Sequence, residues 1–242
     1  MNQPMRVMLG VLVMVLEGRL ALAAAPTFAN PLSITNPYHP FQPGGVKVFR
    51  GQKGATASVI VDLYLDGTRT FHVGAADVPA RILQETEFEG GDVGEISQNF
   101  FAQADDGTVF YFGELVDKYD NGMVTSHEGS WLVGGPTMPS DPPDAGNAQM
   151  PAVFMPANPK VGDSFKPEDL FPIVDETVTV KKIGVEVRLP AGRFDNAIQV
   201  RETSRLPDSP PETKRYAAGV GVVKGKTKGE SFALLASTIR PR

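Results

Sequence analysis

The chain has 242 residues, of which 23 are lysine or arginine, 28 are aspartate or glutamate and none is cysteine, and its net charge is −5. This length suffices for one large β domain or two small ones. The basic residues are scattered and form no stripe of the kind that binds nucleic acid. The lack of cysteine excludes disulfides, thiolate catalysis, cysteine-based metal sites and lipid attachment at a cysteine.

Residues 1–25 have the three parts of a secretory signal peptide. Arg6 supplies the positive region, residues 7–16 form a short apolar run, and Ala21-Leu22-Ala23 offers small side chains for cleavage. The apolar run is too short to span a bilayer core of about 30 Å. We therefore expect an exported mature chain, residues 26–242, in the periplasm or outside the cell, with no stable membrane insertion after cleavage.

A segment with four prolines, residues 30–45, opens the mature chain. Proline disfavours helix and favours extended backbone. We expect Tyr38 and Phe41 to hold this leading segment against the domain. His39 precedes a proline and is predicted to be a surface loop residue.

The remaining chain alternates short β-prone runs with turn residues, and no window after residue 25 has helical periodicity. Asp66-Gly67, Asp106-Gly107 and Asn121-Gly122 are typical of two-residue hairpin turns, because both positions of a type I′ turn need a positive φ. The pattern predicts a mostly β fold, an antiparallel meander that forms a curved sheet, half-barrel or barrel. The expected strands are residues 46–50, 57–65, 68–73, 81–88, 98–103, 108–112, 115–119, 123–126, 175–182, 185–189, 196–206, 213–217, 220–224 and 231–240.

Residues 134–159 interrupt this pattern with seven prolines and little hydrophobic periodicity. Loops of this length in compact domains are either functional or mobile. We therefore expect a single β domain, residues 26–242, that carries a Pro-rich insertion acting as a mobile flap.

Residues 98–134 hold six of the nineteen phenylalanine and tyrosine residues and the only tryptophan. So many rings indicate a sheet covered on both faces or the lining of an apolar groove. Trp131 is expected to be buried against the strand with Phe110 and Phe112. The predicted ligand-binding residues, for a lipid or another apolar small molecule, are Phe100, Phe110, Tyr111, Phe112 and Trp131.

The same stretch contains a polar cluster of candidate site residues: Glu114, Asp117, Asp120, His127 and Glu128. A tight Asn121-Gly122 hairpin would place His127 opposite Val116. Glu114 and His127 would then share one face, and Asp117 and Glu128 the other. Since this brings no three ligands together, a hydrogen-bonded histidine–carboxylate pair is favoured, and we predict no metal and no cofactor.

Several stretches resemble known families. NPYHPFQPGGVKVFRG, DKYDNGMVTSHEGSW, MPANPKVGDSF and LPAGRFDNAIQVRETS are similar to a family of uncharacterised bacterial secreted proteins. The ending KRYAAGVGVVK looks like small periplasmic β proteins of the DUF3108/TapB type, which are similar in outline to lipoprotein carriers of the LolA kind. That resemblance implies a curved antiparallel sheet around an apolar cavity, and it implies no catalytic residues.

Two functions remain open. The first is a non-catalytic periplasmic or secreted protein that binds an apolar or amphipathic ligand, or a partner in the cell envelope. The second is a metal-assisted hydrolase that uses Glu114 and His127. The sequence lacks the G-x-S-x-G, H-E-x-x-H and phosphate-loop motifs of common enzymes, so no catalytic residue is predicted. It does not fix the oligomeric state.

Overall fold

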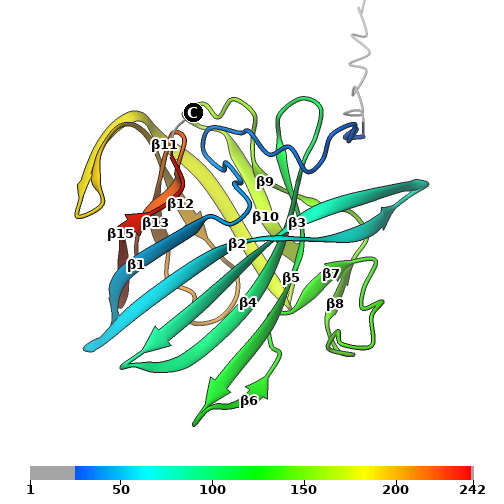
Figure 1. Cartoon of the computed structure of the whole chain (residues 1–242), viewed down its shortest axis with the longest axis horizontal. Coiled ribbons are helices and arrows are strands. Elements are labelled where there is room, and N and C mark those ends of the chain that lie inside the picture. Colours follow the sequence, from blue (N-terminus) through cyan, green and yellow to red (C-terminus); the bar gives the residue numbers. More distant parts are fainter. Residues whose placement is uncertain (1–24, 241–242) are drawn as a thin grey trace, which may run out of the picture.

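The computed structural model describes residues 25–240, which form one sheet of fifteen strands curled into a nearly closed barrel (Figure 1). The mostly β prediction is confirmed. The predicted signal peptide lies outside the described residues, apart from Ala25. Within residues 25–240, no helix has the length and apolarity needed to cross a membrane.

The strands follow one another along the chain with short connections. They are β1 (Val46–Lys53), β2 (Thr56–Val73), β3 (Ala76–Glu89), β4 (Asp92–Gln103), β5 (Val109–Asp120), β6 (Met123–Ser126), β7 (Trp131–Val133), β8 (Gly146–Ala148), β9 (Ala152–Met155), β10 (Ser164–Leu170), β11 (Val174–Leu189), β12 (Gly192–Thr203), β13 (Glu212–Ala217), β14 (Gly221–Lys226) and β15 (Glu230–Ser237).

Two antiparallel meanders make up the barrel. One runs from β1 to β5 and the other from β10 to β15, and the pairing of β15 with β1 joins them. β7 and the parallel strand β8 extend the first meander beyond β5, while β6 and β9 pair with other parts of β5. Most of the wall therefore comes from strands that are neighbours in the sequence.

The turn predictions had mixed outcomes. Asn121 and Gly122 have φ values of 51° and 76°, as a type I′ turn requires. Asp66-Gly67 is not a turn: β2 runs through it, the register with β3 shifts there, and the chain reverses at Gly74 instead. Asp106-Gly107 lies in a longer loop, in which only the glycine has a positive φ.

The leading segment crosses the upper end of the barrel in Figure 1 and is fixed there by Asn36. The Asn36 side chain donates to the carbonyl oxygens of Gly107 and Pro156, each at 3.0 Å. Gln103 Oε1 accepts a hydrogen bond from the backbone N–H of Asn36 at 2.8 Å. Phe41 is buried as predicted, but the surface prediction for His39 is wrong, because its ring is 6% exposed.

Part of the Pro-rich insertion lies against the outer face of the wall, where Arg69 and Asp141 form a buried ion pair. Arg69 Nη2 lies 2.7 Å from Asp141 Oδ2, and the guanidinium also lies over the rings of Phe71 and Phe100. Asp141 accepts two backbone amides of its own loop, at Thr137 and Met138. These contacts tie the insertion to β2.

Two apolar clusters hold the barrel. The larger one lies along β2 to β5 and under the leading segment, and it includes Phe71, Phe112 and Trp131. The smaller one lies among β1 and the C-terminal strands around Phe49 and Leu234. Both clusters are continuous with hydrogen-bonded strands, which is how a β domain without disulfides gains stability.

Trp131 is buried as predicted, at 1% exposure, and its ring lies 5.2 Å from that of Tyr111 in an edge-on contact. We expect Trp131→Ala to lower the free energy of unfolding by about 3–5 kcal/mol, because removal of a large buried ring leaves a cavity. Urea unfolding measures this loss. The control Met123→Ala, at a residue 71% exposed, should change it by less than about 0.5 kcal/mol. Equal losses in the two variants would contradict the burial of Trp131.

Candidate functional site

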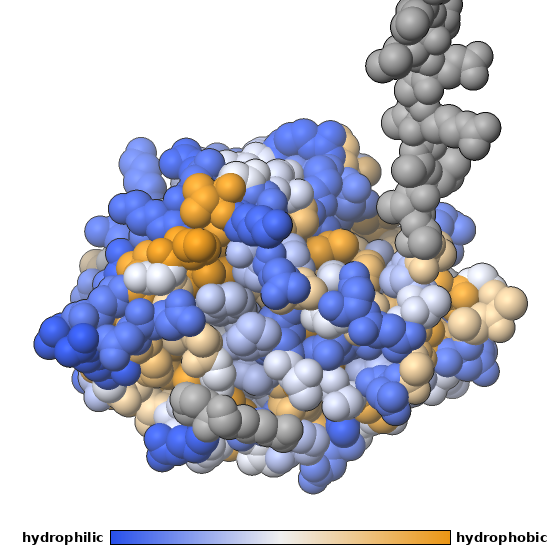
Figure 2. Space-filling model, turned by 90° about the horizontal axis from the view of Figure 1, so that it is seen from above, coloured by the Kyte–Doolittle hydropathy of each residue, from blue (hydrophilic) through white to orange (hydrophobic). Residues whose placement is uncertain are grey.

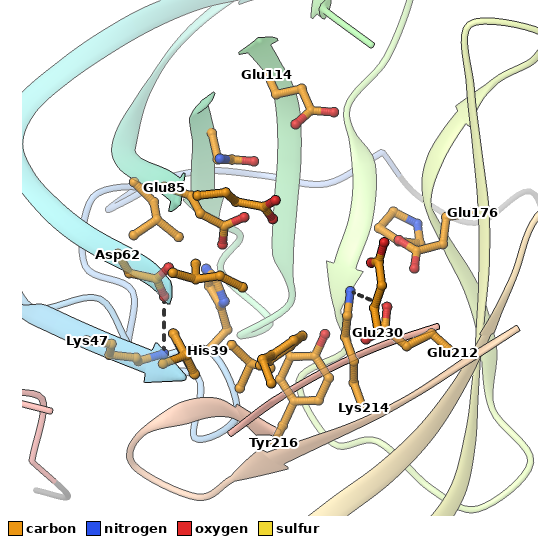
Figure 3. A pocket seen from close by; sticks show the side chains of 18 of the residues that line it. His39, Lys47, Asp62, Glu85, Glu114, Glu176, Glu212, Lys214, Tyr216 and Glu230 are labelled. Atoms are coloured by element: carbon orange, nitrogen blue, oxygen red, sulfur yellow. Dashed lines mark ion pairs between the residues drawn. The ribbon is translucent and has the colours of Figure 1, made fainter. Parts of the chain in front are cut away.

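The barrel encloses a cavity of 330 Å³, lined by residues from most of its strands (Figure 3). Its wall mixes charged, polar and aromatic side chains. The aromatic lining residues are His39, Phe49, Tyr64, Phe101, Tyr111, Phe154, Tyr216 and Phe232. The charged ones are Lys47, Lys53, Lys214, Asp62, Glu85, Glu87, Glu89, Glu114, Glu168, Glu176, Glu212 and Glu230.

Strand alternation explains why glutamates point inward. Successive side chains of a strand point to opposite faces, so Glu85, Glu87 and Glu89 of β3 all face the cavity. On β5 the alternation is broken at Gly113, whose φ is 124° and where the register with β4 shifts. This irregularity lets Tyr111 and Glu114, three residues apart, both line the cavity.

Carboxyl groups on the wall outnumber lysines. Nine carboxyl groups and three lysines line the cavity. Six of the nine carboxyl groups form no ion pair with any described residue: Glu85, Glu87, Glu114, Glu168, Glu176 and Glu230. The interior is therefore an acidic chamber and not an apolar groove.

Asp62 and Glu85 form the first of three contacts between carboxyl groups. Asp62 is 2% exposed, and Lys47 Nζ is 4.0 Å from its Oδ2. Burial raises the pKa of both acids, and the charge of Asp62 raises the pKa of Glu85 further. Burial also lowers the pKa of Lys47 to about 8. A 4.0 Å ion pair does not compensate for this burial, and the charge of Asp62 favours the protonated form of Glu85.

Glu114 and Glu168 form the second contact, across the gap between β5 and β10. Burial and the neighbouring charge of Glu168 raise the pKa of Glu114 well above its usual range. Burial raises the pKa of Glu168 to about 7, although Lys214 opposes the rise. The Tyr111 hydroxyl beside this pair donates to Asn99 Oδ1 at 2.5 Å. The pair shares a proton at neutral pH, as closely spaced carboxyl groups do.

Lys214 anchors the third group of acids. Its Nζ lies 2.7 Å from Glu202 Oε2 and 3.7 Å from Glu212 Oε2. Burial opposes its charge, but Glu202 and Glu212 outweigh burial and raise its pKa well above the usual value. Glu202 is buried beside Glu176, and its pKa is raised to about 8.

The two ends of the cavity differ. At the upper end the ring of His39 packs against Phe101 and Phe154, with centroids 4.5 Å and 4.6 Å away. Side chains cover this end in the view from above (Figure 2). At the lower end Lys53 and Glu89 line the cavity at the hairpin tips, and their side chains are 49% and 35% exposed. Solvent therefore reaches the cavity from the lower end.

His39 is buried in a form that leaves one ring nitrogen without a partner. No described group hydrogen-bonds its Nε2. Burial, followed by the charge of Lys47, lowers the pKa of His39 to about 3. The imidazole is thus neutral, and it presents an unused hydrogen-bonding atom on the wall of the cavity.

The predicted aromatic site is only partly located at the cavity. Of the five residues proposed for ligand binding, Tyr111 alone lines it. Phe100 and Phe112 lie on the opposite face of the sheet and contact Phe71, with ring centroids 5.4 Å and 5.3 Å away. Phe110 and Trp131 are packed elsewhere in the core. Alternation along β5 turns Phe110 and Phe112, the neighbours of Tyr111, away from the interior.

The predicted polar cluster is not brought together. The register of the β5–β6 hairpin shifts by one residue between Lys118 and Tyr119, so Lys118 pairs with Ser126. His127 Nδ1 then lies 2.8 Å from Asp117 Oδ1, and not with Glu114, which lines the cavity. The predicted register is therefore wrong beyond the turn, and His127 Nδ1 also lies within hydrogen-bonding distance, 3.1 Å, of the Val116 carbonyl oxygen.

The other two acids of that cluster lie on the hairpin surface. Glu128 is 3.1 Å from Lys118 Nζ, and Asp120 accepts from the Asn121 side chain at the turn. In the described part of the chain, no group of three or more histidine or acidic side chains could hold a metal ion.

Of the acids that line the cavity, sequence reasoning identified only Glu114. The signal was the period-two run Glu85, Glu87 and Glu89 in an expected strand. Acids at alternate positions are normally assigned to the solvent face, since charged residues are rarely buried. In this barrel the sheet closes on itself, so the face that carries these acids becomes the interior and is not exposed to bulk solvent.

The chain gives no match in comparisons with models of protein families, with curated proteins or with solved structures. The resemblances drawn from the motifs therefore stay predictions. The chemistry of the cavity is the basis for any functional conclusion.

The raised pKa of Glu168 predicts how stability depends on pH. Glu114, Glu202, Lys214 and Asp175 act on it. In the folded chain Glu168 keeps its proton up to about pH 7, whereas in the unfolded chain it loses the proton above about pH 4.5. The contribution of Glu168 to the free energy of unfolding is therefore fully present at low pH and is lost as the pH rises toward 7.

We expect Glu168→Gln to raise the free energy of unfolding at pH 8 by about 1–2 kcal/mol relative to the wild type, and to leave it nearly unchanged at pH 4. Urea unfolding at both pH values measures this. The exposed Glu128→Gln is the matched control. A variant that loses stability at pH 8 would contradict a shared proton.

The exposed pair of His127 and Asp117 predicts a modest structural role. Their side chains are 39% and 43% exposed, and pairs of this kind contribute about 0–1 kcal/mol. We expect His127→Gln to lower the free energy of unfolding by less than about 1 kcal/mol and to leave the metal content unchanged. Near-stoichiometric metal in the wild type that disappears in the variant, measured by mass spectrometry, would revive the hydrolase hypothesis.

Proposed function

We propose that this chain is a non-catalytic binding protein whose barrel holds an amphipathic small molecule. The observation that carries the proposal is the enclosed cavity of 330 Å³, which falls at the lower end of the size range of small-molecule sites. Its wall is contributed by strands of both meanders, so the site is preformed by the fold.

The distribution of side chains favours an amphipathic ligand over a purely apolar one. Rings gather at the closed upper end around His39, Phe101 and Phe154. Carboxyl groups line the middle and the open lower end. A ligand with an apolar part and a polar part could place each part against a matching wall without leaving buried groups unsatisfied.

The hydrolase alternative has lost its basis in the residues first suggested for it. Glu114 lines the cavity, while His127 is paired with Asp117 on the hairpin. We therefore favour binding without catalysis, by an exported protein in the periplasm or outside the cell that takes up a small molecule there.

Native mass spectrometry of protein recovered after export from its own cells tests two parts of the proposal together. The mass should correspond to a chain that begins near Ala24 or Pro26. A small molecule should accompany the folded chain at about one per molecule and be lost on denaturation. An intact Met1 in a membrane fraction would contradict export.

Binding itself can be tested with the neutral fluorescent probe N-phenyl-1-naphthylamine. We expect saturable binding to the wild type and at least about tenfold weaker binding by Ile60→Trp, because the larger ring occupies part of the cavity that Ile60 lines. Val161→Trp, at a residue 57% exposed, is the matched control. No saturable binding, or equal binding by a folded Ile60→Trp, would overturn the proposal.

A further inference from the structure

We propose that the ligand is a linear oligoamine, a chain in which short methylene segments separate ammonium groups. This inference rests on the proposed binding function and specifies its ligand class. It starts from the balance of charge in the cavity, where nine carboxyl groups face three lysines.

The three lysines are already engaged with acids. Lys47 faces Asp62, Lys53 lies 2.5 Å from Glu89, and Lys214 contacts Glu202 and Glu212. The six carboxyl groups without an ion pair are left with one another and with water. A fatty acid or another anion would add charge of the same sign to this wall, whereas a cation would neutralise it.

Two buried atoms provide an independent sign of a missing partner. Asp62 Oδ1 and His39 Nε2 have no hydrogen-bond partner among the described residues. Both side chains belong to the wall of the cavity and are at most 6% exposed. Both are labelled in Figure 3, where they lie on the same side of the chamber as Glu85. An ammonium group has three donors, which these acceptors could share.

The acids are spread along the cavity, which favours an extended cation over an ion. In the described part of the chain no three acidic or histidine side chains converge closely enough to hold a metal. Glu85, Glu87 and Glu89 instead form a ladder along β3, with steps of about 6.6–6.8 Å set by the strand repeat. Charges repeated along a flexible chain match such a ladder, and a single compact ion does not.

The aromatic wall fits the rest of such a molecule. Lys47 Nζ already lies over the rings of Phe49 and Tyr64, 5.9 Å and 5.4 Å from their centroids. Ring faces attract ammonium groups, and they also pack against methylene groups. Each segment of an oligoamine therefore finds a complementary surface.

Isothermal titration calorimetry with spermidine tests the inference at pH 8, with hexane-1,6-diol and adipate as neutral and anionic controls of similar shape. We expect one spermidine per chain and no heat of binding from either control. Glu85→Gln and Glu114→Gln should each weaken spermidine binding about tenfold or more, since an amide cannot lose a proton to an approaching ammonium group and form the charge-assisted contact with it. Glu128→Gln, on the exposed hairpin, should bind as the wild type does.

Binding of N-phenyl-1-naphthylamine by the same variants shows that their cavities are intact. Spermidine that fails to bind while the neutral probe binds would overturn the oligoamine and leave the proposed function standing. Equal spermidine affinity in the wild type and in both interior variants would also overturn it, as would displacement of spermidine by stoichiometric Ca²⁺. Failure of both spermidine and the probe would overturn the proposed function.

Discussion

A carboxylate that moves from water into a protein interior loses most of its hydration, and another group must replace it. In this barrel the acids of β2, β3, β5, β10, β11, β13 and β15 have too few lysines to do so. Burial and the neighbouring carboxylates instead favour the protonated forms of Glu85, beside Asp62, and of Glu168, beside Glu114. The interior can therefore accept positive charge, either as protons or as a bound cation.

Apolar packing on both faces of the wall stabilises the barrel around these acids. The larger apolar cluster lies beneath the leading segment and includes the outward-facing Phe71 as well as Phe101 and Tyr111, which line the cavity. On the outer face, Arg69 and Asp141 fasten the Pro-rich insertion to β2. Because part of this packing lies outside the cavity, the interior does not have to be filled by apolar side chains alone, and a polar chamber can persist.

The sequence was sufficient for the class of fold because turn chemistry and period-two runs are local properties. Asn121-Gly122 was predicted correctly for that reason. Asp66-Gly67 has the same local signature, yet β2 continues through it, because pairing with β3 on both sides outweighs the preference for a turn. Local signals identify strands but do not decide which turn signal is used.

The candidate site was harder to predict, because it depends on which face of each strand becomes interior. The aromatic residues Phe100 and Phe112 were placed at the ligand site, but they lie on the outer face. Their hydrophobicity indicated burial correctly, but it did not indicate whether they face the inside or the outside of the barrel. The irregularities at Gly113 and at Thr125, each of which shifts a register by one residue, have no unambiguous sequence signature.

The joint between the two meanders has a consequence for how the chain folds. One edge of β1 pairs with β2, and the other edge pairs with β15 near the end of the chain. At this joint the Val46 backbone amide donates to the Thr238 hydroxyl, across 192 residues of sequence. Contacts between distant segments form slowly, because the intervening loop must close first. During synthesis the first meander can form while the second is still emerging, but the chamber cannot exist until the last strand is available. Until then the acids of the future interior remain in water, fully charged and mutually repelling.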